Sequence, residues 1–326
     1  MIDYKYLLQD TNAYKIVKND CEQAKLSHAY LIINPDQKNL VNYLKEFAKL
    51  IVCEEKKGCG ECRNCKLIEK NSHSDVLFFP ENGETVLTND IVKLIDESFY
   101  KPIEGDKKVF VVYLAHTMNA QAQNKLLKTL EEPPKGVHIL LGATNEFSLL
   151  PTIKSRVKKL EISGFSNKKL IDCLSKECSN LTLLERAVKM GDGTITKALS
   201  LYGDENFLET SNLVEELLSN MKSSREVLEY SQKVLALKGD LDEFLSILEL
   251  YFRDLLMHYC GKDQLINNTQ ILDSAVLENG YNASSIILAI SKIEEARKRR
   301  NFNANETMLV EWLLFQILEG KHKWQK

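Results

Sequence analysis

The first half of the chain alternates short apolar runs with longer stretches whose apolar residues recur at helical spacing. The runs Val109–Leu114 and His138–Ala143 are apolar and rich in β-branched residues, which is typical of strands buried on both faces. Between them, Asn119–Glu132 places leucines on one side of a helix that two prolines then end. A strand, a helix and a strand at this spacing form a βαβ unit, so we expect an α/β fold with a parallel sheet.

Further elements of the same kind precede this unit. The pattern predicts strands at His28–Ile33 and Asp75–Phe79, and helices at 11–26, Gln37–Val52 and Thr88–Tyr100. The first of these strands runs directly into the helix at Gln37, and this is the place where a P-loop would lie. A P-loop needs glycines so that backbone N–H groups wrap phosphates, a lysine for the β- and γ-phosphates, and a hydroxyl for magnesium.

From about Gly164 the pattern is helical to the end of the chain. Three short amphipathic helices are predicted within 166–202, and longer ones at about 206–221, 223–237, 240–260, 283–299 and 305–319. At 326 residues the chain is longer than one typical core supports. We therefore expect two or three domains, and the pattern divides the chain into an α/β part over residues 1–163, short helices over 164–204 and long helices over 205–326.

Composition narrows the class of protein. Apolar residues make up 44% and charged residues 27%, as in ordinary globular proteins, and no apolar run reaches about 18 residues. The N-terminus has an early acid and no apolar signal core, so we expect a cytoplasmic protein with no membrane contact. A net charge of −3 and a pI near 6.1 argue against a stand-alone duplex binder. The basic run Arg297–Arg300 is typical of a solvated helix end, with phosphate contact as the alternative.

Four of the eight cysteines form a C-x5-C-x2-C-x2-C array at Cys53, Cys59, Cys62 and Cys65. Four thiolates close a tetrahedron around Zn²⁺ at roughly 2.3 Å per bond, which leaves no open position and predicts a structural rather than a catalytic site. The alternatives are a redox CxxC pair, which here would lie in a charged loop, and free buried thiols. Cys53 is the ligand that the pattern fixes least, because it ends a predicted helix and the five-residue gap can vary.

Several motifs in order resemble the AAA+ clamp-loader family. They are the strand at Val109, the sequence NKLLKTLEEPP (124–134), a strand ending in Thr144-Asn145, and LLPTIKSR (149–156). A zinc module at the position of residues 53–70 also occurs in bacterial clamp-loader subunits. The resemblance extends over essentially the whole chain. It implies an AAA+ parallel-sheet domain with an inserted zinc module, a helical lid domain and a C-terminal helical collar domain that forms oligomer contacts.

Relative to this family, the nucleotide-binding residues are missing. Asn34, Gln37 and Asn39 stand at the positions of P-loop glycines, Leu40 at that of the lysine and Val41 at that of the Ser or Thr. Tyr113 and Leu114 replace the acids that hold magnesium in active members. Two independent parts of a phosphoryl-transfer site are therefore absent, and we predict that this chain neither binds ATP tightly nor hydrolyses it.

The sequence Ser155-Arg156-Val157 stands where clamp loaders carry a Ser-Arg-Cys motif. In the family this arginine lies at the subunit interface against ATP bound by the neighbour, so the resemblance implies that Arg156, with Ser155 beside it, acts in trans as an arginine finger. The planar charge of arginine suits the negative charge that develops on a transferring phosphate. The alternative is an ordinary surface arginine near a helix end. Asn145, in a sensor-like place, is interpreted as a loop or cap residue.

The resemblance implies a non-hydrolysing subunit of the bacterial DNA polymerase III clamp loader, a ring that places the sliding clamp on primed DNA. The implied partners are the tau or gamma ATPase subunits and the delta subunit, with clamp and DNA reached through the complex. One alternative is a divergent ATPase of the same family, and another is a stand-alone zinc-bearing nucleic-acid binder. A zinc hydrolase or deaminase is least supported, because the array is all cysteine and lacks a nearby His–Glu pair.

Overall fold

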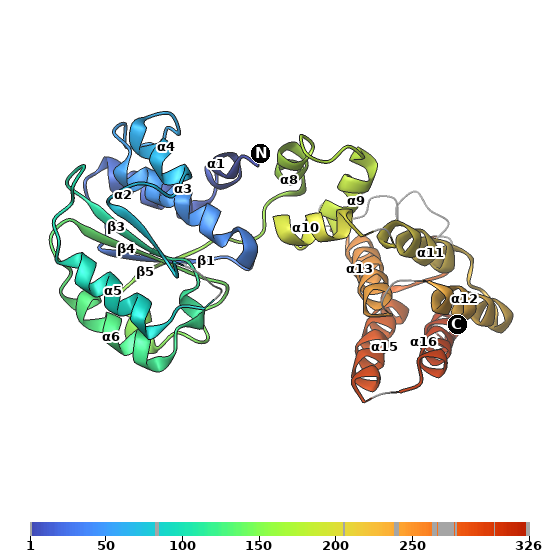
Figure 1. Cartoon of the computed structure of the whole chain (residues 1–326). Helices are drawn as coiled ribbons and strands as arrows, with labels where there is room; N and C mark the ends of the chain where they lie inside the picture. The colour runs from blue at the N-terminus through green and yellow to red at the C-terminus, as the bar shows by residue number, and fades with distance from the viewer. Residues whose placement is uncertain are drawn as a thin grey trace. The chain divides into compact units, whose positions relative to one another are not determined.

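The computed structural model describes residues 2–81, 85–204, 206–237, 241–262, 266, 277, 279–302 and 304–323. The chain forms two compact units, shown in Figure 1. The first comprises Met1–Ser179 and Gly193–Thr196, and the second comprises Asn180–Asp192 and Lys197–Lys326. The three domain boundaries predicted from the sequence stay a prediction.

The first unit is built on a five-stranded parallel sheet with the order β2-β3-β4-β1-β5. The strands are β1 (Ala29–Ile33), β2 (Val76–Phe79), β3 (Lys108–Val112), β4 (Val137–Ala143) and β5 (Lys158–Glu161). The predicted α/β fold and its parallel sheet are confirmed. The strand β5 was not predicted, because its sequence KKLE has one buried position and lies at an edge of the sheet.

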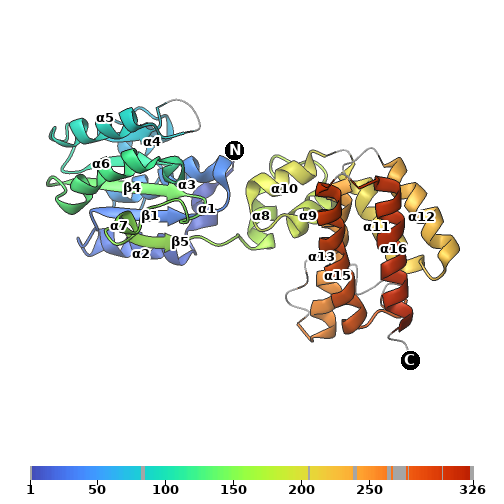
Figure 2. The ribbon, with the colours of Figure 1, turned by 90° about the horizontal axis from the view of Figure 1, so that it is seen from below.

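Helices cover both faces of this sheet (Figures 1 and 2). On one face lie α2 (Asn12–Glu22) and α3 (Leu40–Val52), and on the other lie α5 (Thr88–Ser98) and α6 (Ala120–Glu131). Side chains alternate between the two faces of a strand, so a strand with helices on both sides is apolar throughout. This explains the continuous apolar runs from which the buried strands were predicted.

The helix α3 packs tightly against β4 at Gly142. A Cβ atom at this position would lie 2.5 Å from Leu44 Cδ1 and 3.2 Å from Leu40 Cγ. Glycine therefore lets the two leucines of α3 pack directly against the strand backbone. This contact sets the position of the helix that follows the first strand.

Several short elements were not predicted. They are α1 (Tyr4–Leu8), α4 (Arg63–Glu69) and α7 (Pro151–Lys154), together with the 3-10 turn η2 (Ala115–Thr117), while the predicted helix Gln37–Val52 begins as the 3-10 turn η1 (Gln37–Asn39) before α3. With five, seven and four residues, the three helices are too short to show a helical period. The first unit also contains α8 (Asn167–Leu174), which falls within the predicted helical segment.

The helices of the second unit follow the predicted ranges closely, although the predicted start at residue 240 lies outside the described residues. They are α9 (Leu181–Met190), α11 (Phe207–Asn220), α12 (Ser224–Ala236), α13 (Leu241–Tyr259), α15 (Ala283–Asn301) and α16 (Glu306–Lys323), while α10 (Ile195–Tyr202) begins in the first unit. Buried residues from α11, α13, α15 and α16 form one apolar core. No helix in the described parts of the chain combines the length and apolarity needed to cross a membrane.

The basic run at the end of α15 is engaged with neighbouring helices. Arg297 lies 2.5 Å from a carboxylate oxygen of Glu249 on α13. The guanidinium of Arg299 stacks on the ring of Trp312 at 3.9 Å from its centroid, and Arg300 pairs with Asp242. The run is therefore a partly solvated helix end, in which three of the four cations also contact residues of α13 or α16.

Candidate functional site

The loop between β1 and α3 contains a buried carboxylate. Asp36 is 2% exposed and accepts hydrogen bonds from the backbone N–H groups of Ile195 at 3.0 Å and Thr196 at 3.3 Å. It also accepts a short hydrogen bond from Thr196 Oγ1, at 2.5 Å. These donors belong to the first turn of α10, where the helix dipole favours a negative charge. The carboxylate of Asp36, a side chain of this loop, thus lies at the N-terminus of α10.

Two further side chains saturate this carboxylate. Asn39 Nδ2 lies 3.1 Å from each Asp36 oxygen, and the Tyr43 hydroxyl donates to Asp36 Oδ2 at 3.1 Å. Burial raises the pKa of Tyr43, and the nearby Asp36 charge raises it further by a smaller amount. This hydroxyl therefore stays protonated and acts as a donor. Tyr4 of α1 donates to Asn39 Oδ1 at 2.8 Å. Asn39, which stands at the position of a P-loop glycine, therefore belongs to the hydrogen-bond network around Asp36.

The sequence did not identify Asp36, Tyr4 or Thr196 as parts of this site. Thr196 lies 160 residues from Asp36 along the chain, and no local pattern connects them. The other asparagine of the loop, Asn34, donates to Ile162 O at 3.1 Å and accepts from the backbone N–H of Asp36 at 2.8 Å. The loop is consequently held by side-chain amides where a P-loop would have bare backbone.

The other predicted nucleotide positions are occupied by packing residues. Leu40 is fully buried, and Val41 beside it is half-buried. Leu114 belongs to the core under α5 and α6, and the Tyr113 hydroxyl donates to Pro80 O at 3.1 Å. None of these four side chains offers a phosphate or magnesium ligand. Lys38, also in the loop, is exposed.

The four cysteines of the predicted zinc module lie together. The Sγ atoms of Cys53, Cys59, Cys62 and Cys65 are all within 4.8 Å of one another, and those of Cys53 and Cys59 are 3.6 Å apart. A tetrahedral Zn²⁺ with bonds of roughly 2.3 Å requires sulfur atoms about 3.8 Å apart. The cluster therefore fits a zinc ion with little movement, and all four sulfurs would serve as its ligands.

Backbone groups around this cluster favour thiolates. The N–H of Cys59 donates to Cys53 Sγ at 3.4 Å, and that of Cys62 donates to Cys59 Sγ at 3.3 Å. Burial opposes ionisation of Cys53, but the backbone N–H donors outweigh it and lower the pKa of this thiol to about 6. Burial raises the pKa of Cys65. Cys53, the ligand that the spacing determines least, thus has a thiol whose pKa is lowered by its surroundings.

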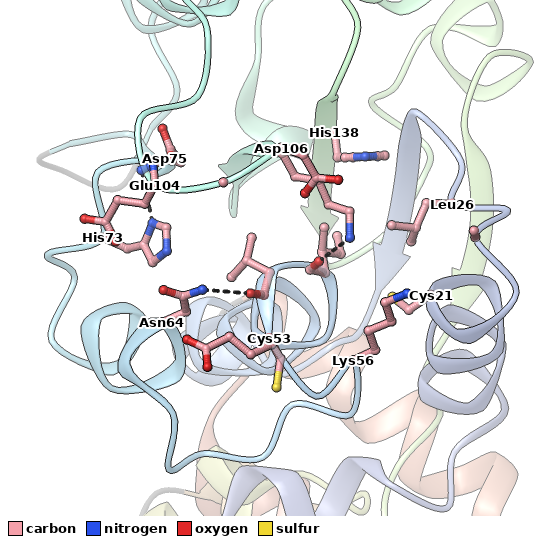
Figure 3. A pocket seen from close by; sticks show the side chains of 16 residues that line it. Cys21, Leu26, Cys53, Lys56, Asn64, His73, Asp75, Glu104, Asp106 and His138 are labelled. Carbon is pink, nitrogen blue, oxygen red and sulfur yellow. Dashed lines mark hydrogen bonds between the residues drawn. The ribbon is translucent and has the colours of Figure 1, made fainter.

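The end of α3 is anchored beside this cluster. Lys107 Nζ donates to Ile51 O at 2.9 Å and Asn64 Nδ2 donates to Val52 O at 3.0 Å, so two carbonyls of the last helical turn are satisfied. Figure 3 shows these bonds at a polar pocket of about 570 Å³, which Cys53, His73 and Asp106 also line. The Cys53 sulfur points away from His73 and Asp106 (Figure 3).

Arg156 lies just before β5, on the surface of the first unit. Its NH1 group donates to Thr152 O at 2.9 Å and to Ser155 Oγ at 3.2 Å, and its NH2 group lies 2.6 Å from Glu131 Oε1. The side chain remains 34% exposed. Ser155 Oγ itself donates to Thr152 O at 3.0 Å. Glu131 is a partner that the sequence did not assign, although it stands in the NKLLKTLEEPP motif.

Asn145 has a local role at the end of β4. Its Oδ1 accepts a hydrogen bond from the backbone N–H of Phe147 at 3.0 Å, which is typical of a loop residue. The backbone N–H of Thr144 donates to His116 Nδ1 at 3.3 Å. Burial lowers the pKa of His116, so the neutral ring that accepts this bond is favoured. The interpretation of Asn145 as a loop residue agrees with this geometry.

Comparisons with known proteins find similarity to subunits of DNA polymerase III. A family model described as "DNA polymerase III, delta subunit" matches residues 9–166. The DNA polymerase III subunit delta' of Bacillus subtilis is 28% identical over 94% of this chain and 95% of its own length. The tau subunit of the same organism is 27% identical over 75% of this chain, which spans 48% of that relative. A gamma subunit-related protein of Thermotoga maritima is 23% identical, with 95% of this chain and 100% of that chain covered and a TM-score of 0.44.

The five-stranded parallel sheet and the helices on both of its faces form the sheet domain of an AAA+-type protein. Near full-length similarity to a subunit of one bacterial assembly narrows this class further. The chain is similar to the DNA polymerase III subunit delta' over almost the whole of both chains, and residues 9–166 match the delta-subunit family model.

Proposed function

We propose that this chain is a non-hydrolysing subunit of a DNA polymerase III clamp loader and assists in placing the sliding clamp on primed DNA. The observation that carries the proposal is the similarity to a delta' subunit along almost the whole of both chains. Its partners are the tau or gamma ATPase subunits and the delta subunit. Clamp and DNA are engaged through the complex, which agrees with the net charge of −3 of this chain.

The absence of nucleotide binding is proposed from the β1–α3 loop. A phosphate placed there would meet the buried carboxylate of Asp36, and the repulsion between like charges is strong in a site that excludes water. The donors that a phosphate requires are already used by that carboxylate. With Leu40 at the position of the P-loop lysine, the cation that would face the β- and γ-phosphates is missing.

Calorimetric titration of Mg-ATP into the isolated chain tests this point. We expect no binding heat up to about 1 mM ATP, where a partner ATPase subunit titrated in parallel saturates. Micromolar affinity, or ATP hydrolysis by the isolated chain, would instead favour the alternative of a divergent ATPase of the same family.

Arg156 is proposed to complete the ATP site of a neighbouring subunit. Its guanidinium is partly exposed and is held by acceptors on one side, so unused donors remain available to a phosphate from outside. Because the chain has no nucleotide of its own in this proposal, the arginine would act only in trans. Ser155 supports it through the hydrogen bond from NH1 to the serine hydroxyl.

The cysteine cluster is proposed to hold one structural Zn²⁺. The ion would tie Cys53, at the end of α3, to Cys65 within α4, and would thereby fold a loop that has few apolar residues of its own. With four sulfur ligands, no position remains for a substrate or an activated water. The ion therefore takes no part in a chemical step.

A clamp-loading assay with the reconstituted assembly tests the proposed function. Delta, the tau or gamma subunits, the clamp, primed DNA and ATP are mixed with and without this chain, and clamp retained on circular DNA is counted. We expect loading only when the chain is present. A chain that fails to join the complex on gel filtration, but binds primed DNA alone with steep salt dependence, would contradict the proposal and favour the stand-alone nucleic-acid binder.

A further inference from the structure

We infer that Glu131 is a positioning residue for Arg156, which it holds in the orientation needed to meet a phosphate of the neighbouring subunit. This inference rests on the proposed role of Arg156 in trans. Glu131 Oε1 lies 2.6 Å from Arg156 NH2, and the two side chains are 48% and 34% exposed. The pair is therefore formed on the surface of the first unit, where an approaching subunit can reach it.

Three acceptors determine the orientation of the guanidinium. NH1 is bound by Thr152 O at 2.9 Å and by Ser155 Oγ at 3.2 Å, and both of these acceptors lie on the short segment that precedes Arg156. Glu131 is the acceptor of NH2 and comes from a different element, α6. Without it, the contacts at NH1 alone leave the guanidinium plane free to swing away from the surface.

The backbone of Arg156 is fixed as well, because its carbonyl oxygen lies 3.1 Å from Nε2 of His28, the residue just before β1. Among the described residues, no hydrogen bond uses the Nε–H of Arg156. An arginine has five N–H donors in one plane, so the three bonds that it makes leave others for a ligand. A charge fixed in advance stabilises a transition state better than one that must first be ordered, because no reorganisation accompanies the reaction.

The position of Glu131 in its own helix supports this role. It is the last residue of α6, and a second acid, Glu132, follows it. The C-terminus of a helix carries partial negative charge and favours cations, so two acids at this end are locally unfavourable. Glu131 is an acid at a helix end that favours cations, and it forms an ion pair with Arg156. An unfavourable residue that contacts a proposed functional group indicates a functional constraint. Glu132 forms no ion pair within the described parts of the chain and provides a matched control.

The test is steady-state ATP hydrolysis by the reconstituted clamp loader, with clamp and primed DNA present. Complexes contain the wild-type chain, Glu131→Gln, Glu131→Asp, Glu132→Gln, Arg156→Ala, or Glu131→Gln combined with Arg156→Ala. Thermal unfolding of each chain and gel filtration of each complex show that folding and assembly are intact.

We expect Glu131→Gln to lower kcat about tenfold with KM for ATP unchanged, because the lost orientation matters only in the transition state. Glu131→Asp keeps the charge on a shorter side chain and should retain more activity than Glu131→Gln. Glu132→Gln should behave as wild type. In the Arg156→Ala background, Glu131→Gln should cause no further loss, since it acts through the arginine.

Three results would overturn the inference: full activity of Glu131→Gln when Arg156→Ala is impaired, an equal loss in Glu132→Gln, or a further loss in the double variant. Full activity of Arg156→Ala would overturn the proposed role of Arg156 itself. If Glu131→Gln fails to fold or assemble, activity of Glu131→Asp equal to that of Arg156→Ala also counts against the inference, since the Asp variant is expected to retain partial activity.

Discussion

At the scale of single residues, the β1–α3 loop is held by the buried carboxylate of Asp36, which accepts hydrogen bonds from Ile195, Asn39 and Tyr43. Substitutions at Asn39 and Leu40 could be found by comparison with a P-loop, because that motif has fixed spacing. The replacement network depends on Asp36 and on donors that lie 159 and 160 residues away in the sequence. Only the fold brings these groups together, so no local pattern could have predicted the pairing.

The Asp36 network predicts a large loss of stability on truncation. In Asp36→Ala, the buried donors of Ile195, Asn39 and Tyr43 lose their shared acceptor. Each unsatisfied buried donor costs about 1–3 kcal/mol, and partial rearrangement leaves a net loss of roughly 3 kcal/mol. Urea unfolding of the full chain, followed by circular dichroism, measures this loss.

Asp106→Asn is the control for this measurement, because Asp106 is exposed. We expect its free energy of unfolding to remain within about 0.5 kcal/mol of wild type. If Asp36→Ala also fell within that margin, the carboxylate would not be holding the loop.

At the scale of elements, long periodic segments were predicted well and short or polar ones were not. The buried strands β3 and β4 and the helix α6 were recognisable because burial on one or both faces dictates their pattern. The edge strand β5 is mostly exposed and α7 has four residues, so neither carries such a pattern. The cysteine array was recognisable for a different reason, since ligand chemistry fixes its spacing.

The packing of α3 on β4 predicts that Gly142 does not tolerate a side chain. In Gly142→Ala, the new methyl group meets Leu44 Cδ1 at 2.5 Å, so the helix or its leucines must shift. Overpacking of this kind costs about 1–3 kcal/mol, measurable by urea unfolding. Gly105→Ala is the matched control, because its Cβ meets nothing within 4 Å. Equal stability of the two variants would show that α3 is not tightly packed at this strand.

The cysteine module predicts one zinc ion per chain. Metal analysis of the purified protein should find one equivalent in wild type and in Cys260→Ser, which changes an exposed cysteine outside the cluster. Cys62→Ser should lose the ion, and chelation of wild-type zinc should expose residues 53–69 to proteolysis, because metal binding and local folding are coupled. A full equivalent of zinc in Cys62→Ser would exclude that residue as a ligand.

At the scale of the whole molecule, the chain combines an AAA+-type sheet unit with a helical unit and is similar to one clamp-loader subunit almost from end to end. The proposed account gives each part a separate role. The β1–α3 loop replaces nucleotide with an internal carboxylate, the cysteine cluster folds a surface loop, and Arg156 acts on a neighbour. The helical unit supplies oligomer contacts in this account. Its central claim is that this chain contributes to ATP hydrolysis without binding ATP.

The most direct test of that claim is the rate of DNA- and clamp-stimulated ATP hydrolysis by complexes containing wild type, Arg156→Ala or Arg156→Lys. Lys154→Ala, two residues earlier, serves as the control, and gel filtration confirms assembly of each complex. Arginine fingers contribute large factors to phosphoryl transfer, so the account predicts that Arg156→Ala removes at least about nine-tenths of the stimulation that depends on this chain. Arg156→Lys should remain impaired, because lysine lacks the planar fork. Full stimulation by an assembled Arg156→Ala complex would contradict the account.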